Sequence, residues 1–172
     1  MGQTMITAAF LALLIVSAIS VNRMLIESGE TSYKTEAYSQ AVGIAHELLT
    51  EITSKRYDEG ATSGGAQTLS AFTLPPAGPE ASEVFSPLPD VSPYQSPTRY
   101  DDLDDYKGYS RIAHGATISG FLVTANVYYV NTTSPHAAAT GRTYMKRIDI
   151  TVSHSLYLDA ASPFRISRFV SY

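Results

Sequence analysis

The first 22 residues carry no charged side chain, and this stretch limits what the chain can fold into more than any other feature. Residues 5–21 read MITAAFLALLIVSAISV, which makes every face of a helix apolar. As a helix, the charge-free stretch would span roughly 33 Å at about 1.5 Å per residue, close to a bilayer hydrocarbon core of about 30 Å. We therefore expect residues 1–26 to lie in a membrane or to pack among other apolar helices.

Four structures compete for this segment. A cleaved signal peptide has a basic region before its apolar run, and no Lys or Arg precedes the run here. A plain membrane anchor and a buried core helix are the second and third alternatives. The fourth, which we favour, is a helix that packs against copies of itself, because its small residues permit close helix approach. The residues expected in such a filament core are Met5, Ala8, Ala9, Phe10, Ala12, Leu13, Val16 and Ile19.

Beyond Arg23 the pattern changes from apolar all round to amphipathic. Apolar residues recur at spacings of three and four, which is one stripe of a helix, at Tyr33, Ala37, Ala41, Ile44, Ala45, Leu48, Leu49 and Ile52. Glu51 and Lys55 have the spacing of a favourable helical ion pair. Gly60 is a typical stop signal. The sequence predicts one long helix over residues 1–57, apolar in its first half and amphipathic in its second.

The remaining residues, 58–172, are predicted to form a β-rich head. Seven prolines between Pro75 and Pro97 exclude a helix from the Pro-rich loop at residues 61–99. We expect this loop to pack over the head rather than to act as a flexible linker. A short strand is expected at residues 69–74.

Three segments of the head have the character of strands, at residues 120–131, 143–154 and 164–171. The middle one alternates apolar with polar side chains, the period of a half-buried strand. Short connections favour antiparallel pairing. We expect the face formed by Ile148, Ile150 and Val152 to cover the helical stripe at Ile44, Leu48 and Ile52. The predicted fold class is therefore α+β, a long N-terminal helix packed on a C-terminal antiparallel sheet.

Two segments resemble a known family. Residues 41–52 with 55–60 (AVGIAHELLTEI and KRYDEG), and residues 100–109 (YDDLDDYKGY), are similar to segments of type IV pilins, in particular minor pilins of the mannose-sensitive haemagglutinin type. The resemblance implies a pilin-like fold and a structural subunit of an extracellular filament. It also implies insertion in the inner or cytoplasmic membrane before assembly, with other copies and the pilus assembly machinery as partners. Cell adhesion, motility, secretion and DNA uptake stay open.

The chain departs from the family at one position. Many mature pilins carry Glu as their fifth residue, following a cut after a Gly. A cut between Gly2 and Gln3 would make Thr7 the fifth residue, whereas a start at Met1 makes it Met5. The missing carboxylate favours, as an alternative, a minor pilin or pseudopilin that primes or tips a pilus or a type II secretion pseudopilus. A membrane-anchored binding domain is the third possibility.

Little in the sequence indicates catalysis. There is no Cys, and His46-Glu47 begins an HExxH pattern that position 50, a Thr, does not complete. The net charge of -4 gives no basic surface for nucleic acid. We therefore expect no enzyme, no cofactor and no nucleic-acid partner.

Two weaker signals concern ligands and modification. Asp101, Asp102, Asp104 and Asp105 are oxygen ligands of the kind Ca²⁺ prefers. We favour instead a turn in which these carboxylates accept hydrogen bonds from nearby backbone N–H groups. Asn131-Thr132-Thr133 is a glycosylation sequon, expected on a hairpin loop.

Overall fold

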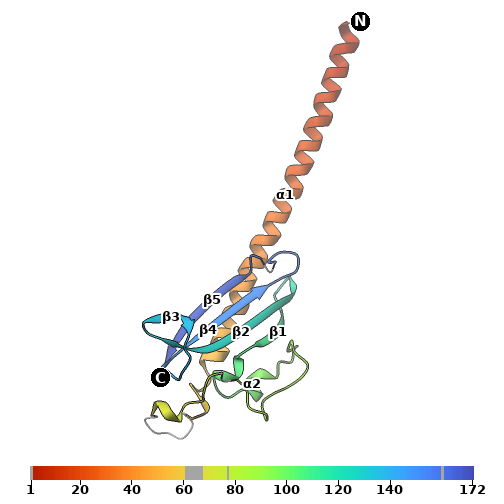
Figure 1. Cartoon of the computed structure of the whole chain (residues 1–172). Helices are drawn as coiled ribbons and strands as arrows, with labels where there is room; N and C mark the ends of the chain where they lie inside the picture. Colours follow the sequence, from red (N-terminus) through yellow and green to blue (C-terminus); the bar gives the residue numbers. More distant parts are fainter. Residues whose placement is uncertain (1, 61–67, 77, 160) are drawn as a thin grey trace. The chain divides into compact units, whose positions relative to one another are not determined.

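The structure, a computed structural model, describes residues 2–60, 68–76, 78–159 and 161–172 (Figure 1). Its internal contacts divide the chain into two compact units, Met1–Ala37 and Tyr38–Tyr172. Helix α1 runs from Gly2 to Thr53, so the second unit begins inside this helix. Parts of two predicted segments, residue 1 of the helix and residues 61–67 and 77 of the Pro-rich loop, lie outside the described residues.

The second unit carries all the strands. After α1 come the 3₁₀ turn η2 (Leu69–Ala71), the short helix α2 (Ser96–Arg99) and the 3₁₀ turn η3 (Asp104–Tyr106). The strands follow as β1 (Tyr109–His114), β2 (Ser119–Asn131), β3 (Ser134–Ala138), β4 (Met145–Ser153) and β5 (Phe164–Ser171). They form one sheet in the order β1-β2-β4-β5, with β3 pairing with the end of β2. All of these pairings are antiparallel.

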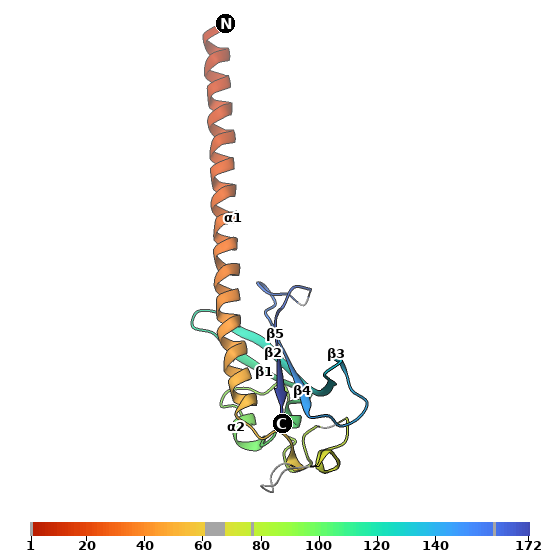
Figure 2. The same cartoon turned by 90° about the vertical axis from the view of Figure 1, so that its left-hand side faces the viewer.

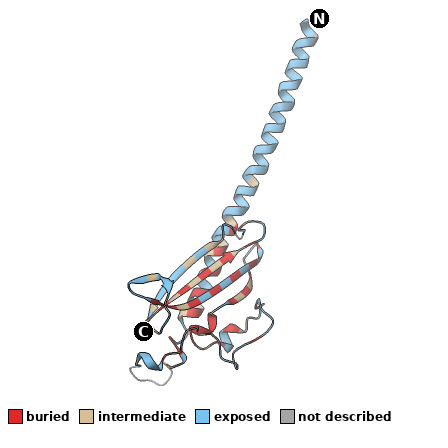
Figure 3. Ribbon diagram, viewed as in Figure 1, coloured by how far each residue is buried: buried red, intermediate tan, exposed pale blue. Residues whose placement is uncertain are grey.

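The core lies between the sheet and the last turns of α1, as the sequence predicted (Figure 2). Alternate residues of β4 are buried, including Ile148, Ile150 and Val152. The helical stripe at Ile44, Leu48 and Ile52 is buried too. Figure 3 shows buried residues both on the sheet and on the part of α1 beside it. Antiparallel pairing places Ala125 beside Ile150 and Val127 beside Ile148, which extends the apolar face into β2. The α+β prediction is confirmed.

Helix α1 ends at Thr53, earlier than the predicted residue 57. The backbone of Arg56 instead bonds to the loop before η3, donating to the carbonyl of Asp101 at 3.1 Å and accepting from the N–H of Leu103 at 3.0 Å. Gly60 does not end the helix; a Cβ there would collide with the carbonyl oxygen of Ala71. The chain therefore leaves the helix because it is bonded to another segment of the head.

Two other local predictions were wrong. Residues 69–74 contain the 3₁₀ turn η2, not a strand. Phe72 at its end is buried against Tyr57 and Tyr172, with ring centroids 5.3 and 5.1 Å away. Lys55 does not pair with Glu51; its ammonium donates to two loop carbonyls at 2.9 and 2.7 Å. The described part of the Pro-rich loop packs on the head.

Strand β1 was missed by the sequence analysis because its centre is a charged residue. The side chain of Arg111 is fully buried and faces the helix, where it pairs with Glu47 and Glu51 at 3.1 Å each. The Tyr94 ring lies 4.5 Å from its guanidinium carbon. Tyr106 and Ser96 hydroxyls each donate to Glu51 at 2.7 Å. A buried ion pair with further hydrogen bonds therefore occupies a position that the alternation rule assigns to an apolar side chain.

The two glutamates at Arg111 provide a matched test of this pair. Glu51 is 14% exposed and Glu47 is 64% exposed, at equal distances from the guanidinium. We expect Glu51→Gln to lower the free energy of unfolding by about 3 kcal/mol, because a buried cation loses its charged partner. Glu47→Gln should cost less than about 1 kcal/mol, as for exposed pairs. Urea unfolding of the full chain in detergent, followed by tyrosine circular dichroism, measures both; equal losses would contradict the burial argument.

Candidate functional site

The first unit exposes the apolar segment that the sequence singled out. The predicted filament-core residues are all exposed, and the larger ones strongly so, with Met5 at 76% and Leu13 at 67%. This part of α1 is long and apolar enough to cross a membrane. A membrane anchor and a signal sequence share that property, so the segment is a candidate for either. Arg23 and Glu27 form an exposed pair at 3.0 Å where the apolar run ends.

The acidic run folds into a turn of reciprocal hydrogen bonds. Asp102 Oδ1 accepts the N–H of Asp104 at 2.6 Å and that of Asp105 at 3.4 Å. Asp105 Oδ2 in turn accepts the N–H groups of Asp101 and Asp102 at 2.9 and 3.1 Å. These carboxylates hold the backbone in its turn, as we favoured from the sequence.

Asp104 belongs to a second, fully buried group around Lys146. The Lys146 ammonium lies 2.7 Å from Asp104 Oδ1 and 2.9 Å from Asp58 Oδ2, and donates to the Tyr57 carbonyl at 2.7 Å. The rings of Tyr57 and Tyr129 flank it at 4.6 and 4.7 Å. Burial raises the pKa of Asp104 to about 6, although the Lys146 charge opposes this. Burial also acts on Asp58, but hydrogen bonds from Tyr129 and Lys146 bring its pKa below the ordinary value.

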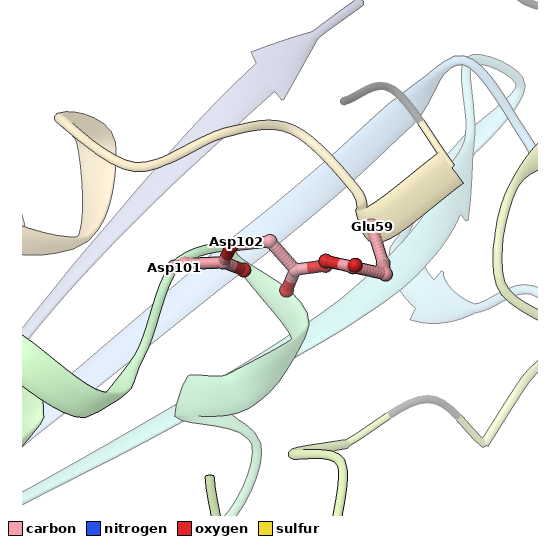
Figure 4. Close-up of side chains that lie close together, drawn as sticks. All are labelled: Glu59, Asp101 and Asp102. Atoms are coloured by element: carbon pink, nitrogen blue, oxygen red, sulfur yellow. The ribbon is translucent and has the colours of Figure 1, made fainter. Parts of the chain in front are cut away.

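Among the residues that the structure describes, two groups of carboxylates are close enough to hold a metal ion, and neither is the predicted set of four. Glu59 joins Asp101 and Asp102 (Figure 4), while Glu80 and Glu83 join Asp105. Within each group the oxygens lie within 4.8 Å of one another. The three glutamates are distant in sequence from the acidic run, so only the fold identifies them.

Calcium binding by Asp101, Asp102, Asp104 and Asp105, the alternative to the turn, stays a prediction. A rise in the melting temperature on adding Ca²⁺ would support it, and an unchanged melting temperature would count against it.

The remaining predicted residues lie at the surface. Asn131 is exposed at the end of β2 and pairs with Ser134 across a tight turn, so the sequon is accessible. His46 is an exposed residue of α1, as expected for a solvated helix position.

Comparison of the chain with protein-family models, with curated proteins and with solved structures finds no match.

The buried Asp102 carboxyl makes stability depend on pH. Burial, then the charges of Asp104 and Asp105, raise its pKa from 3.8 to about 8. The folded chain therefore binds this proton more tightly than the unfolded chain between about pH 4 and pH 8, and its contribution to stability falls as the pH rises through that window. We expect Asp102→Asn to flatten the fall in melting temperature between pH 5 and pH 8.

Asp101→Asn is the control for this measurement. The Asp101 side chain is 45% exposed and pairs with Arg56 at 3.2 Å. This variant should keep the wild-type pH dependence. An Asp102→Asn profile parallel to the wild type would contradict the assignment.

Proposed function

We propose that the chain is the structural subunit of a type IV pilus-like filament, polymerising through its apolar N-terminal helix. The observation that carries the proposal is a charge-free helical segment whose large side chains are exposed, in a chain whose other unit has a buried core of its own. The proposal includes membrane insertion before assembly, an extracellular filament afterwards, and no enzymatic activity.

The exposed segment has two apolar environments available. In a bilayer its side chains contact lipid tails; in a filament they contact other copies. Exchange between the two keeps apolar surface away from water, so the hydrophobic effect does not oppose release from the membrane. Small residues at Ala8, Ala9 and Ala12 reduce the distance at which backbones can pack.

Helix α1 connects this segment to the head. Helix α1 extends into both units. Each copy that packs its first residues against those of other copies therefore also contributes a head to the filament. Contacts between different surfaces of successive copies are heterologous, and they propagate as an open helical polymer when the rotation does not close. A membrane-anchored monomer needs none of these contacts.

A minor pilin that primes or tips a filament is the second candidate. The observation in its favour is that the apolar run at residues 5–21 contains no acidic residue, whereas many pilins carry a Glu near the start of this segment. The amount of this chain in sheared filaments separates the candidates, because a main subunit is present along the whole length and a tip subunit only once.

Substitutions at Ala12 test the filament core. Ala12→Leu keeps the segment apolar but adds bulk where helices would approach, so we expect membrane fractionation unchanged and filaments lost. Ala12→Ser stays small and should retain filaments. Ala12→Arg introduces a charge that costs about 3 kcal/mol at the centre of a bilayer, so it should impair insertion as well.

Electron microscopy of sheared material counts the filaments, and thermal melting in detergent checks that the head stays folded. Filaments formed equally by all three variants would contradict the proposal. Monomers of the wild-type chain in detergent would favour the membrane-anchored alternative.

A further inference from the structure

Glu80 and Glu83 lie on one turn of the Pro-rich loop. The carbonyl oxygen of Glu80 accepts the N–H groups of Glu83 at 2.9 Å and of Val84 at 3.1 Å. The Glu83 carboxylate closes the turn, since its Oε2 accepts the N–H of Glu80 at 3.1 Å. Glu83 is also partly buried. The turn is thus an ordered segment that carries two carboxylates close together.

This turn is packed on the head next to the acidic run. Phe85, two residues beyond the turn, is buried, and its ring centroid lies 5.2 Å from that of Tyr100. In this position Glu80, Glu83 and Asp105 each offer one carboxylate oxygen, and these three oxygens lie within 4.8 Å of one another. Carboxylates from two segments that are distant in sequence therefore form one group in the second unit.

Asp105 is the buried member of this group, at 0% exposed. Its Oδ2 accepts the N–H groups of Asp101 and Asp102. Its Oδ1 is also buried, and no donor reaches it from the part of the chain that the structure describes. A buried acceptor in this state costs free energy unless a donor or a cation meets it. The carboxyl group that carries this oxygen is the one that Glu80 and Glu83 approach, so the missing partner is missing within this group.

The described residues supply no cation to this group. None of the ion pairs between them includes Glu80, Glu83 or Asp105. Arg99 contacts the turn, but its guanidinium donates to the carbonyl of Ser82 at 3.5 Å and not to a carboxylate. Three carboxylates so close together repel one another unless a positive charge lies among them or they share a proton. A cation from outside the chain would supply that charge.

The ligand atoms of the group select a hard divalent cation, because all three are carboxylate oxygens. Ca²⁺ binds oxygen ligands at about 2.3–2.6 Å, so two ligands of one ion lie at most about 5 Å apart, which the group satisfies. Mg²⁺ usually takes only one or two carboxylates and keeps several waters. We propose that Glu80, Glu83 and Asp105 bind a Ca²⁺ ion, which attaches the turn of the Pro-rich loop to the acidic run. This set shares only Asp105 with the four aspartates considered from the sequence.

The test uses the full chain in a non-ionic detergent, treated with EDTA and then dialysed. Isothermal titration calorimetry should show saturable binding of Ca²⁺ and weaker binding of Mg²⁺, and Ca²⁺ should raise the melting temperature. Glu83→Gln keeps an oxygen for the Glu80 N–H but removes a charge. It should weaken Ca²⁺ binding by roughly tenfold or more, because the affinity of such sites depends on the charge of their ligands. Its melting temperature without Ca²⁺ shows whether the variant is folded.

Glu59→Gln is the matched control, because it makes the same change in the other group of three carboxylates, where Asp101 already pairs with Arg56. It should bind Ca²⁺ as the wild type does. Three results would each overturn the proposal. They are no Ca²⁺ binding by the wild type up to about 10 mM, above the range of extracellular sites, tighter binding of Mg²⁺ than of Ca²⁺, and equal affinity of Glu83→Gln and Glu59→Gln. The filament proposal is independent of all three, since it concerns a different unit of the chain.

Discussion

Two buried cations connect the end of helix α1 to the sheet, and the arrangement of the head depends on them. Arg111 in β1 pairs with Glu51 of the helix, and Lys146 in β4 pairs with Asp58 just after it. A cation taken out of water is costly unless its partners are well placed, so only one register of helix on sheet satisfies both pairs. The apolar stripe alone would permit sliding by a turn. The ion pairs therefore specify the packing that apolar burial stabilises.

These same pairs explain where sequence reasoning succeeded and where it failed. Strand β4 was predicted from its apolar face of period two, β2 from its β-branched and aromatic residues, and β5 from Ile166 and Val170 on one face. Strand β1 has Arg111 at its central inward position, and a charged residue there indicates a solvent-facing site unless its partner is known. The partner Glu51 is distant in sequence, and its spacing to Lys55 suggested a local pair instead. Long-range charge pairing was the information that the sequence patterns lacked.

The acidic run, too, was predicted only in part. The sequence was sufficient to predict a turn stabilised by its own carboxylates, because Asp side chains bond to backbone N–H groups a few residues away. It was not sufficient to separate the four aspartates, which differ in the fold. Asp102 and Asp105 bond to the backbone, Asp101 pairs with Arg56, and Asp104 contacts Lys146. Neighbours in sequence thus have different partners, because the fold brings Arg56 to Asp101 and Lys146 to Asp104.

The two units differ in which of their side chains are in an unfavourable environment: buried charges in the second unit, and exposed apolar side chains in the first. In the second unit, charges that are buried are paired, as Lys146 is with Asp58 and Asp104. In residues 1–22 of the first unit there is no charge to pair, and the large apolar side chains remain exposed. Exposed apolar surface of this extent requires lipid or protein around it. The head can thus be stable by itself, whereas the first unit depends on its surroundings, which is the property that an assembling subunit needs.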